Sequence, residues 1–393
     1  ESAYRRIPGI FSIVVSVIAI AFSLFHLYTA AFGVLPAQIQ RAVHLGFGLA
    51  LTYLLYPATR KGAHKLAWYD VALAVLAVFV MSYPVWNFHP LLIRAGAYTR
   101  LDIIIGAIGI LVVLEATRRV VGIPILVVVS VALAYCYFGR YIPGFFQHRG
   151  ASLQRLVSHM FYTTEGIFGI PLGVSSVFIF LFILFGAFLE KTGIGQFFID
   201  ISNSIAGHAA GGPAKVAVIT SAFEGTVSGS SVANTVGSGS FTIPMMKRLG
   251  YRPEFAGAVE ASASTGGQIM PPIMGAAAFL MAEFIGVPYL QIVKSAVIPA
   301  ILYFAGVFIV VHLEAKKTGL KGLERDKLPR FWKIMRERGQ LFLPLVIIVY
   351  LLVTGSTPMK AALWGLVVAV FSSFLSSATR IKRGDIISAL EMG

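Results

Sequence analysis

The sequence predicts an all-α protein that crosses a membrane many times, with about ten transmembrane helices, one re-entrant helical hairpin and one discontinuous helix. Of its 393 residues 57% are hydrophobic and only 12% are charged, and its mean hydropathy is +0.81. A soluble domain carries about a quarter charged residues, so lipid must cover much of this surface. The net charge of +15 falls in clusters between apolar runs, which is typical of membrane loops and excludes nucleic acid as the expected partner.

Ten apolar runs define the expected spans, because a helix needs roughly 20 apolar residues to cross a bilayer. The ninth run is shorter than the others. The runs lie at about 10–31, 41–58, 67–87, 101–121, 122–139, 171–190, 254–285, 288–313, 340–354 and 358–377.

The basic clusters favour a cytoplasmic N-terminus, since Lys and Arg concentrate in cytoplasmic loops. A single topology, in which successive spans alternate in direction, places nearly every basic cluster on the cytoplasmic side of the membrane. It requires that residues 213–247 enter and leave the membrane on the same side. That condition requires a re-entrant hairpin. The clusters are Arg60, Lys61 and Lys65; Arg118 and Arg119; Lys247, Arg248 and Arg252; residues 316–338; and Arg380, Lys382 and Arg383.

Three segments combine charge with apolar residues at helical spacing: Leu153–Phe161, Phe331–Arg338 and Asp385–Leu390. This pattern predicts helices that lie in the membrane interface. Ordinary connecting loops are the alternative for each.

The hairpin tip is made of small and polar residues. Twelve of the sixteen residues from Gly225 to Ser240 are Gly, Ala, Ser or Thr, which is poor lipid-facing sequence. The first arm, from Pro213 to Val227, would be about 22 Å of helix, less than the roughly 30 Å hydrocarbon core. We therefore expect the tip to be buried against protein or water.

A second interruption follows. Pro253–Thr265 can be helical, whereas Gly266–Pro272 contains two glycines and two prolines and cannot form regular helix. We expect the helix to resume at Ile273, with Pro272 at a favoured first position, and to end near Glu283.

Two helix breaks at membrane depth predict one shared binding site, because unwound backbone is tolerated there only inside protein or beside water. Free carbonyls at helix ends, with Ser and Asn oxygens, suit a hard cation such as Na⁺. Free N–H groups at helix starts suit a carboxylate. This pattern is typical of transporters with discontinuous helices. The alternative is that small residues only let helices pack closely.

Three stretches, 226–234, 242–251 and 260–275, resemble the large permease subunit of TRAP (tripartite ATP-independent periplasmic) transporters. Residues 141–393 resemble the first half of that subunit's transport domain, with the hairpin at about 212–250 and the broken helix at about 253–285. Residues 1–140 resemble the small four-helix subunit, fused ahead of it as in permeases that work with TAXI-type binding proteins.

The resemblance implies a bacterial inner-membrane permease with an elevator-type, inverted-repeat fold. Such a permease uses a Na⁺ gradient and no ATP. It takes a small organic acid from a periplasmic substrate-binding protein, and needs no cofactor beyond the coupling ion. The second repeat's Ser/Gly-rich hairpin does not follow Gly286, so we expect this chain to correspond to part of the transport core.

The resemblance also identifies candidate site residues. The Na⁺ candidates are Ser230, Ser231 and Asn234 with the backbone of Gly266 and Gly267. The candidates for substrate are Ser264, Thr265 and Gln268, of which Ser264 and Thr265 are also Na⁺ candidates and Gln268 has a structural role in the break as its alternative.

Two carboxylates, Glu224 and Glu260, lie within apolar helices and are candidates for tuning ion binding, since intramembrane carboxylates are costly. The alternative is a hydrogen bond or an ion pair between packed helices, for example with Lys215. Glu115 is expected to pair with Arg118 and Arg119 on its own helix.

Other functional classes have less support. The sequence contains no His-Glu-x-x-His motif, no nucleophile elbow and no phosphate-binding loop, so we expect neither an enzyme nor ATP-driven transport, and no transition-metal site. An ion-coupled carboxylate transporter without a binding protein and a non-transporting scaffold remain alternatives. The sequence does not distinguish Na⁺ from H⁺ and does not name the substrate.

Overall fold

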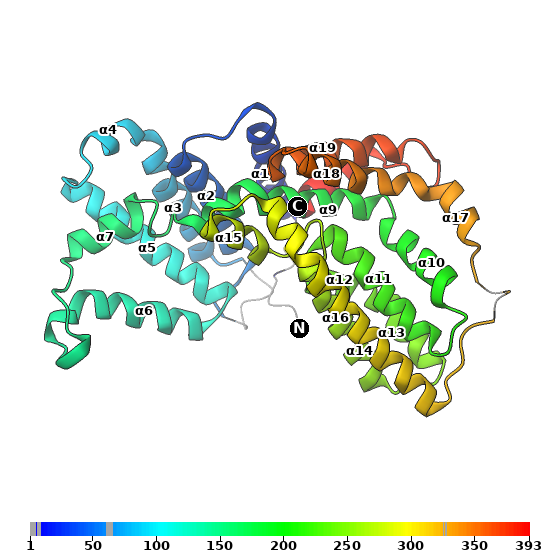
Figure 1. The fold of residues 1–393 in the computed structure, drawn as a ribbon. Coiled ribbons are helices and arrows are strands. Elements are labelled where there is room, and N and C mark those ends of the chain that lie inside the picture. Colours follow the sequence, from blue (N-terminus) through cyan, green and yellow to red (C-terminus); the bar gives the residue numbers. More distant parts are fainter. Residues whose placement is uncertain (1–4, 6–8, 60–65, 325, 327) are drawn as a thin grey trace. The chain divides into compact units, whose positions relative to one another are not determined.

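The computed structural model describes residues 5, 9–59, 66–324, 326 and 328–393, and these residues contain helices and no strands (Figure 1). The all-α membrane fold expected from the sequence is confirmed. The basic cluster Arg60, Lys61 and Lys65 lies outside the described residues. The chain divides into two compact units, residues 1–176 and 177–393.

The first unit is built from α-helices joined by short connections. Its helices are α1 (Ile10–Phe32), α2 (Ala37–Leu55), α3 (Trp68–Trp86), α4 (Phe88–Ile93), α5 (Arg100–Val120), α6 (Ile123–Phe138), α7 (Leu153–Tyr162) and α8 (Ile170–Val174).

The second unit begins within a π-helical turn, Ser175–Ile179, that leads into α9. Its helices are α9 (Phe180–Lys191), α10 (Ile194–Ala206), α11 (Gly212–Ser228), α12 (Ser231–Gly237), α13 (Gly239–Arg248), α14 (Pro253–Gly266), α15 (Ala276–Ile285), α16 (Tyr289–Thr318), α17 (Phe331–Arg338), α18 (Leu343–Val353), α19 (Pro358–Ser373) and α20 (Arg383–Met392).

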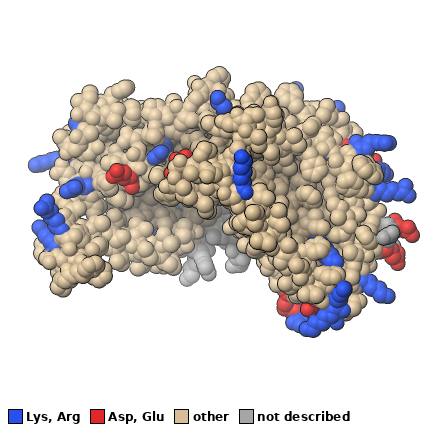
Figure 2. Space-filling model, viewed as in Figure 1, with Lys and Arg blue, Asp and Glu red and all other residues tan. Residues whose placement is uncertain are grey.

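Five helical stretches among the described residues are long and apolar enough to cross a membrane. Each coincides with one of the apolar runs in the sequence, and the remaining runs form shorter or less apolar helices. The five are Ile10–Phe32, Trp68–Trp86, Ile123–Tyr141, Ile170–Lys191 and Tyr289–Thr318. Uncharged side chains cover most of the face drawn in Figure 2, as lipid contact requires.

The three segments expected to be interfacial are helical, as α7, α17 and α20. Helix α10 was not expected from the sequence. Helix α10 is amphipathic: Phe197, Phe198 and Ile201 are buried, whereas Gln196 is exposed. Such a helix lacks the continuous apolar run that marks a span.

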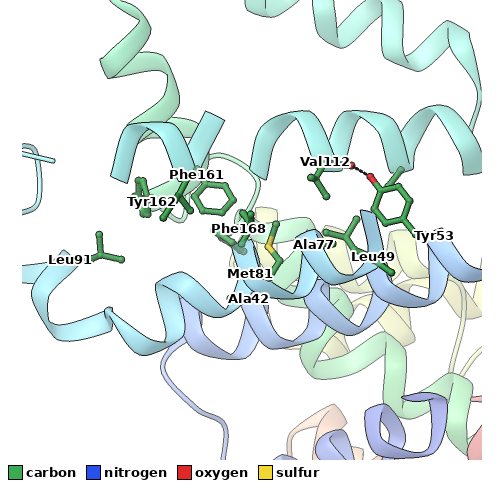
Figure 3. Close-up of a cluster of buried hydrophobic side chains, with 14 of the residues drawn as sticks. Ala42, Leu49, Tyr53, Ala77, Met81, Leu91, Val112, Phe161, Tyr162 and Phe168 are labelled. Atoms are coloured by element: carbon green, nitrogen blue, oxygen red, sulfur yellow. Dashed lines mark hydrogen bonds between the residues drawn. The ribbon is translucent and has the colours of Figure 1, made fainter. Parts of the chain in front are cut away.

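The core of the first unit lies between α2, α3 and α5, with aromatic residues from α7 closing one end (Figure 3). Tyr53 is fully buried, and its hydroxyl donates to the carbonyl of Val112, 2.5 Å away. This bond satisfies the only polar atom that the Tyr53 side chain brings into an otherwise apolar core.

Buried charges in the first unit meet charges of opposite sign. Asp70 is fully buried between the guanidinium groups of Arg5, at 2.8 Å, and Arg119, at 2.7 Å. The expected pairing of Glu115 with Arg118 and Arg119 is confirmed. A buried charge pair is costly to break because the remaining partner is left uncompensated.

Candidate functional site

The hairpin of the second unit begins with α11 and returns through α12 and α13. The turn between them is only two residues long. Gly229 has φ +59°, a left-handed conformation that favours glycine, and Ser230 caps α12 by accepting a hydrogen bond from the backbone N–H of Ala233 at 3.2 Å. Asn234 therefore lies inside α12 rather than in the turn.

The helix break follows α14, which ends at Gly266. Gly267–Ile269 form a single 3-10 turn, and regular helix resumes only at Ala276. The expectation that helix resumes at Ile273 with Pro272 at its first position was wrong. Met274 adopts φ +59°, outside helical geometry, and the Tyr289 hydroxyl lies within hydrogen-bonding distance of the Pro272 and Ile273 carbonyls that helix would otherwise use.

The hairpin and the break meet through glycines. A Cβ atom on Gly225 of α11 would lie 2.6 Å from the Cα of Gly267, and one on Gly229 would lie 1.9 Å from the carbonyl oxygen of Met274. No side chain fits in either place without a shift of backbone. The two interruptions seen in the sequence therefore lie against each other, backbone to backbone.

Asn234 is the buried polar residue at this meeting point. Its side chain is 2% exposed, and its Oδ1 accepts a hydrogen bond from Ser228. Its Nδ2 has no hydrogen-bond partner among the residues that the structure describes and would lie 2.4 Å from a Cβ on Gly267. One polar atom of the buried Asn234 carboxamide therefore faces Gly267 without a partner among the described residues.

Two other candidates join the same region. The amide Nε2 of Gln268 donates to the Ser231 hydroxyl at 2.9 Å, which ties the break to the first turn of α12. Ser230 lies beside them, and its backbone N–H donates to the Ser228 hydroxyl at 3.1 Å. The structure thus brings together Ser230, Ser231, Asn234, Gly267 and Gln268.

Thr265 and Ser264 lie elsewhere, whereas the backbone of Gly266 adjoins Gly267 and only its Cβ position points away from the hairpin. The Cβ position of Gly266 faces Tyr303 and Phe304 of α16. Thr265 is exposed, and its hydroxyl donates to the carbonyl of Ala261 on its own helix at 2.7 Å. Ser264 is fully buried and contacts Glu260 instead of the hairpin tip.

Glu260 is fully buried among hydroxyl groups. Its Oε1 accepts from Ser238 at 2.7 Å, from Ser264 at 3.1 Å and from Ser221 at 3.4 Å. Its Oε2 accepts from Thr242. Three helices and the α12–α13 junction supply these groups, so Glu260 holds both arms of the hairpin to α14.

Glu224 lies on α11, one turn before Ser228, and its surroundings differ. Its Oε2 is buried and has no hydrogen-bond partner in the described part of the chain. The suggested ion pair with Lys215 was wrong: the Lys215 ammonium lies 3.0 Å from Nδ1 of His312 on α16 and above the Phe308 ring.

Comparison with known proteins identifies the family to which this chain belongs. The family model for the DctM component of the tripartite ATP-independent periplasmic transporter matches residues 108–393. This chain belongs to that family.

Several curated relatives of this TRAP permease are named TRAP transporter permease proteins. The chain is 31% identical over 196 residues to the C4-dicarboxylate TRAP transporter large permease protein of Pseudomonas aeruginosa, covering 50% of this chain and 45% of that protein. It is 26% identical over 196 residues to the isethionate TRAP transporter permease protein of Oleidesulfovibrio alaskensis, covering 48% and 31%. The chain spans about half the length of the C4-dicarboxylate permeases it matches.

The family match begins at residue 108, inside α5. It therefore includes the end of α5 and all of α6, which the sequence interpretation placed in the small-subunit-like region. It also covers the hairpin, the break and every candidate residue named above.

Sequence reasoning missed several residues of this TRAP permease site. Ser228 and Gly225 stand in the small-residue stretch that drew attention to the hairpin, but nothing in their spacing marks them apart from their neighbours. Ser221, Ser238 and Thr242 converge on Glu260 from separate helical segments. A carboxylate within an apolar helix is the one signal that pointed there.

Proposed function

We propose that this TRAP permease chain is part of a Na⁺-coupled, ATP-independent importer of a small organic acid that a periplasmic binding protein delivers. In this proposal Na⁺ binds where the hairpin tip meets the helix break. The family supports transport as the activity, and the coupling ion and substrate are inferred from the site and from relatives.

One observation carries the proposal. Asn234 is buried beside interrupted backbone at Gly267 with a polar atom that has no partner. An unpartnered buried polar atom costs about 1–3 kcal/mol. The Nδ2 that faces Gly267 is a donor and cannot ligate a cation; a half-turn of the carboxamide would bring Oδ1 there while Nδ2 donates to the Ser228 hydroxyl, and a bound Na⁺ would then offset the cost. Serine and carboxamide oxygens with carbonyls at the end of α11 form an all-oxygen set, which hard cations prefer.

The substrate class follows from the relatives. Their names specify C4-dicarboxylate, isethionate and sialic acid, all of which are organic acids. The proposed partner is a periplasmic binding protein of the TAXI type, with residues 1–140 acting as a fused small-subunit-like region. The proposed location is the bacterial inner membrane, with a cytoplasmic N-terminus.

The test is uptake by the full-length permease in liposomes, with its binding protein outside. Uptake of labelled C4-dicarboxylates and other organic acids is measured with and without an inward Na⁺ gradient. Asn234→Ala and Ser231→Ala are compared with wild type, and Thr265→Ala serves as the matched control because its hydroxyl bonds to its own helix.

We expect uptake to need both Na⁺ and the binding protein, and the Na⁺ concentration for half-maximal uptake to rise about tenfold in Asn234→Ala, which corresponds to about 1.4 kcal/mol. Uptake without the binding protein would favour the carboxylate transporter that works alone. Absence of uptake with any ion, by a folded permease, would favour a scaffold.

A further inference from the structure

Lys215 is a buried cation at the start of the hairpin. The residue is only 5% exposed, and it is the fourth residue of α11, near the positive end of that helix. Buried lysines are normally paired with carboxylates, and the helix dipole disfavours a cation at this end. Among the described residues no Asp or Glu forms an ion pair with Lys215. Its charge therefore lacks a counter-charge there.

The groups that Lys215 contacts come from one face of α16. Its ammonium lies 3.0 Å from Nδ1 of His312 and 5.2 Å from the centre of the Phe308 ring. Residues four apart share a helix face, so Phe308, His312 and Lys316 follow one another along the side of α16 that meets Lys215. The next charged residue on this face is thus a second lysine instead of an acid.

Lys215, His312 and Lys316 offer hydrogen-bond donors, and their one acceptor is already used. An ammonium has three N–H donors and no acceptor. Because Nδ1 of His312 accepts from Lys215, the imidazole proton lies on Nε2, which is a further donor. His312 is half-buried and Lys316 is exposed, so a ligand can approach from the side of Lys316. The chemistry of these groups fits a ligand that is negatively charged and accepts several hydrogen bonds.

A second buried polar group lies at the same helix end. Tyr251 is 5% exposed, and its hydroxyl has no hydrogen-bond partner in the part of the chain that the structure describes. This hydroxyl would lie 2.8 Å from a Cβ on Gly211, whose carbonyl accepts from the backbone N–H of Lys215 at 3.1 Å. The start of α11 therefore carries two buried donors that are short of acceptors.

Basic residues from two distant parts of the sequence gather at this end of the second unit. The backbone N–H of Gly211 donates to the Leu320 carbonyl at 3.3 Å, and a Cβ on Gly250 would lie 3.2 Å from the Leu320 side chain. The segments that follow α13 and α16 thus meet at the start of α11. They carry two of the basic clusters expected on the cytoplasmic side, within 247–252 and 316–338. Figure 2 shows basic side chains gathered, with a few acidic ones, where α16 ends in Figure 1.

We propose that Lys215, His312 and Lys316 bind the phosphate group of an anionic phospholipid. An ionised phosphate supplies both the missing counter-charge and the missing acceptors. A lipid is the source of this phosphate because α16 is apolar enough to cross a membrane, and basic groups between helices at the membrane surface bind anionic headgroups. The inference goes beyond the proposed Na⁺ coupling, and neither of its tests depends on transport.

The first experiment counts bound lipid. Native mass spectra of the purified full-length permease in neutral detergent are recorded with added phosphatidylglycerol or phosphatidylcholine. Lys215→Gln and Lys316→Gln are compared with wild type. Lys317→Gln is the matched control, since Lys317 lies in the same last turn of α16 but on another face.

The dissociation constant for phosphatidylglycerol should rise about tenfold in Lys215→Gln and in Lys316→Gln, the expected loss for one hydrogen bond to a charged group. It should stay unchanged in Lys317→Gln. Phosphatidylcholine, whose choline cancels the phosphate charge, should bind weakly to all four proteins. Equal binding of phosphatidylglycerol by wild type and Lys215→Gln would overturn the inference.

The second experiment uses thermal unfolding, because the effect of Lys215 on stability should change sign. Midpoints of wild type and Lys215→Met are measured in neutral detergent alone, with phosphatidylcholine, with phosphatidylglycerol and with inorganic phosphate. Without anionic lipid the uncompensated ammonium should make wild type the less stable protein. With phosphatidylglycerol wild type should become the more stable one.

Two outcomes would contradict the proposal. If Lys215→Met is the less stable protein in every condition, the counter-charge belongs to the permease itself and no lipid is required. If inorganic phosphate stabilises wild type as much as phosphatidylglycerol does, free phosphate replaces the lipid as the ligand.

Discussion

The two units bury their carboxylates in opposite ways. In the first unit Asp70 lies between Arg5 and Arg119, and Asp102 accepts from Arg94 at 2.8 Å while it caps its own helix. In the second unit Glu260 meets only hydroxyls. The first arrangement sets each carboxylate against a buried positive charge, whereas the second surrounds the carboxylate with neutral hydroxyl groups.

This difference separates the first unit from the second unit, where the proposed ion site lies. A charge pair locks helices because either partner alone is strongly unfavourable. A carboxylate among neutral hydroxyls keeps its geometry with or without a neighbouring ion, since the hydroxyls of Ser238 and Thr242 also lie 2.8 and 3.0 Å from backbone carbonyls one turn earlier.

Asp70→Asn should have the largest effect on stability. It leaves Arg5 buried without a counter-charge and leaves Arg119 with Glu115 as its carboxylate partner, and we expect a loss of about 3–5 kcal/mol in unfolding free energy, measured by denaturant titration of the purified protein. Glu115→Gln, at a partly exposed pair, is the control. Equal stability of the two variants would show that the buried ion pairs of Asp70 do not stabilise the packing of these helices.

Gly225→Ala should come next, because its Cβ would meet the backbone of Gly267. Overpacking of this kind costs about 1–3 kcal/mol, and we expect a reduced apparent Na⁺ affinity in the uptake assay. Gly257→Ala on α14 is the matched control, since a Cβ there meets nothing within 4 Å. Wild-type Na⁺ dependence in Gly225→Ala would separate the glycine contact from ion binding.

Glu260→Gln should destabilise much less than Asp70→Asn, by about 1 kcal/mol. The hydroxyls of Ser238 and Thr242 can donate to backbone carbonyls instead, and no basic residue loses its counter-charge. The same denaturant titration decides the comparison. A loss as large as that of Asp70→Asn would mean that the hydroxyls cannot reorient and that the contrast between the units is false.

Thr265→Val should have the smallest effect, within about 0.5 kcal/mol, with unchanged Na⁺ dependence. Its exposed hydroxyl bonds only to the Ala261 carbonyl among the described contacts. A marked change in substrate affinity would restore Thr265 as a substrate ligand and place the site on the exposed side of α14.

Sequence reasoning located the hairpin and the break because both have strong local signals. Two glycines and two prolines within Gly266–Pro272 rule out regular helix, and a run of small residues in 225–240 marks a tip that lipid cannot cover. Glu115 with Arg118 and Arg119 was equally local, since the pairing depends only on helical spacing.

The remaining features depend on tertiary contacts. The restart of helix at Ala276 depends on Tyr289 from the next helix. Likewise His26 of α1 and His44 of α2 hydrogen-bond to each other at 2.8 Å. No spacing in the sequence records which helices become neighbours.

The backbone contact between Gly225 and Gly267 has a consequence for sequence variation. Each position is restricted by the main chain of the other, so a side chain at either one requires the two segments to separate. We therefore expect permeases that carry alanine or serine at one of these positions to differ nearby as well. The difference would lie in the length of the hairpin turn or in the path of the chain between Met270 and Ala276. Substitutions here should be inherited in groups and not one at a time.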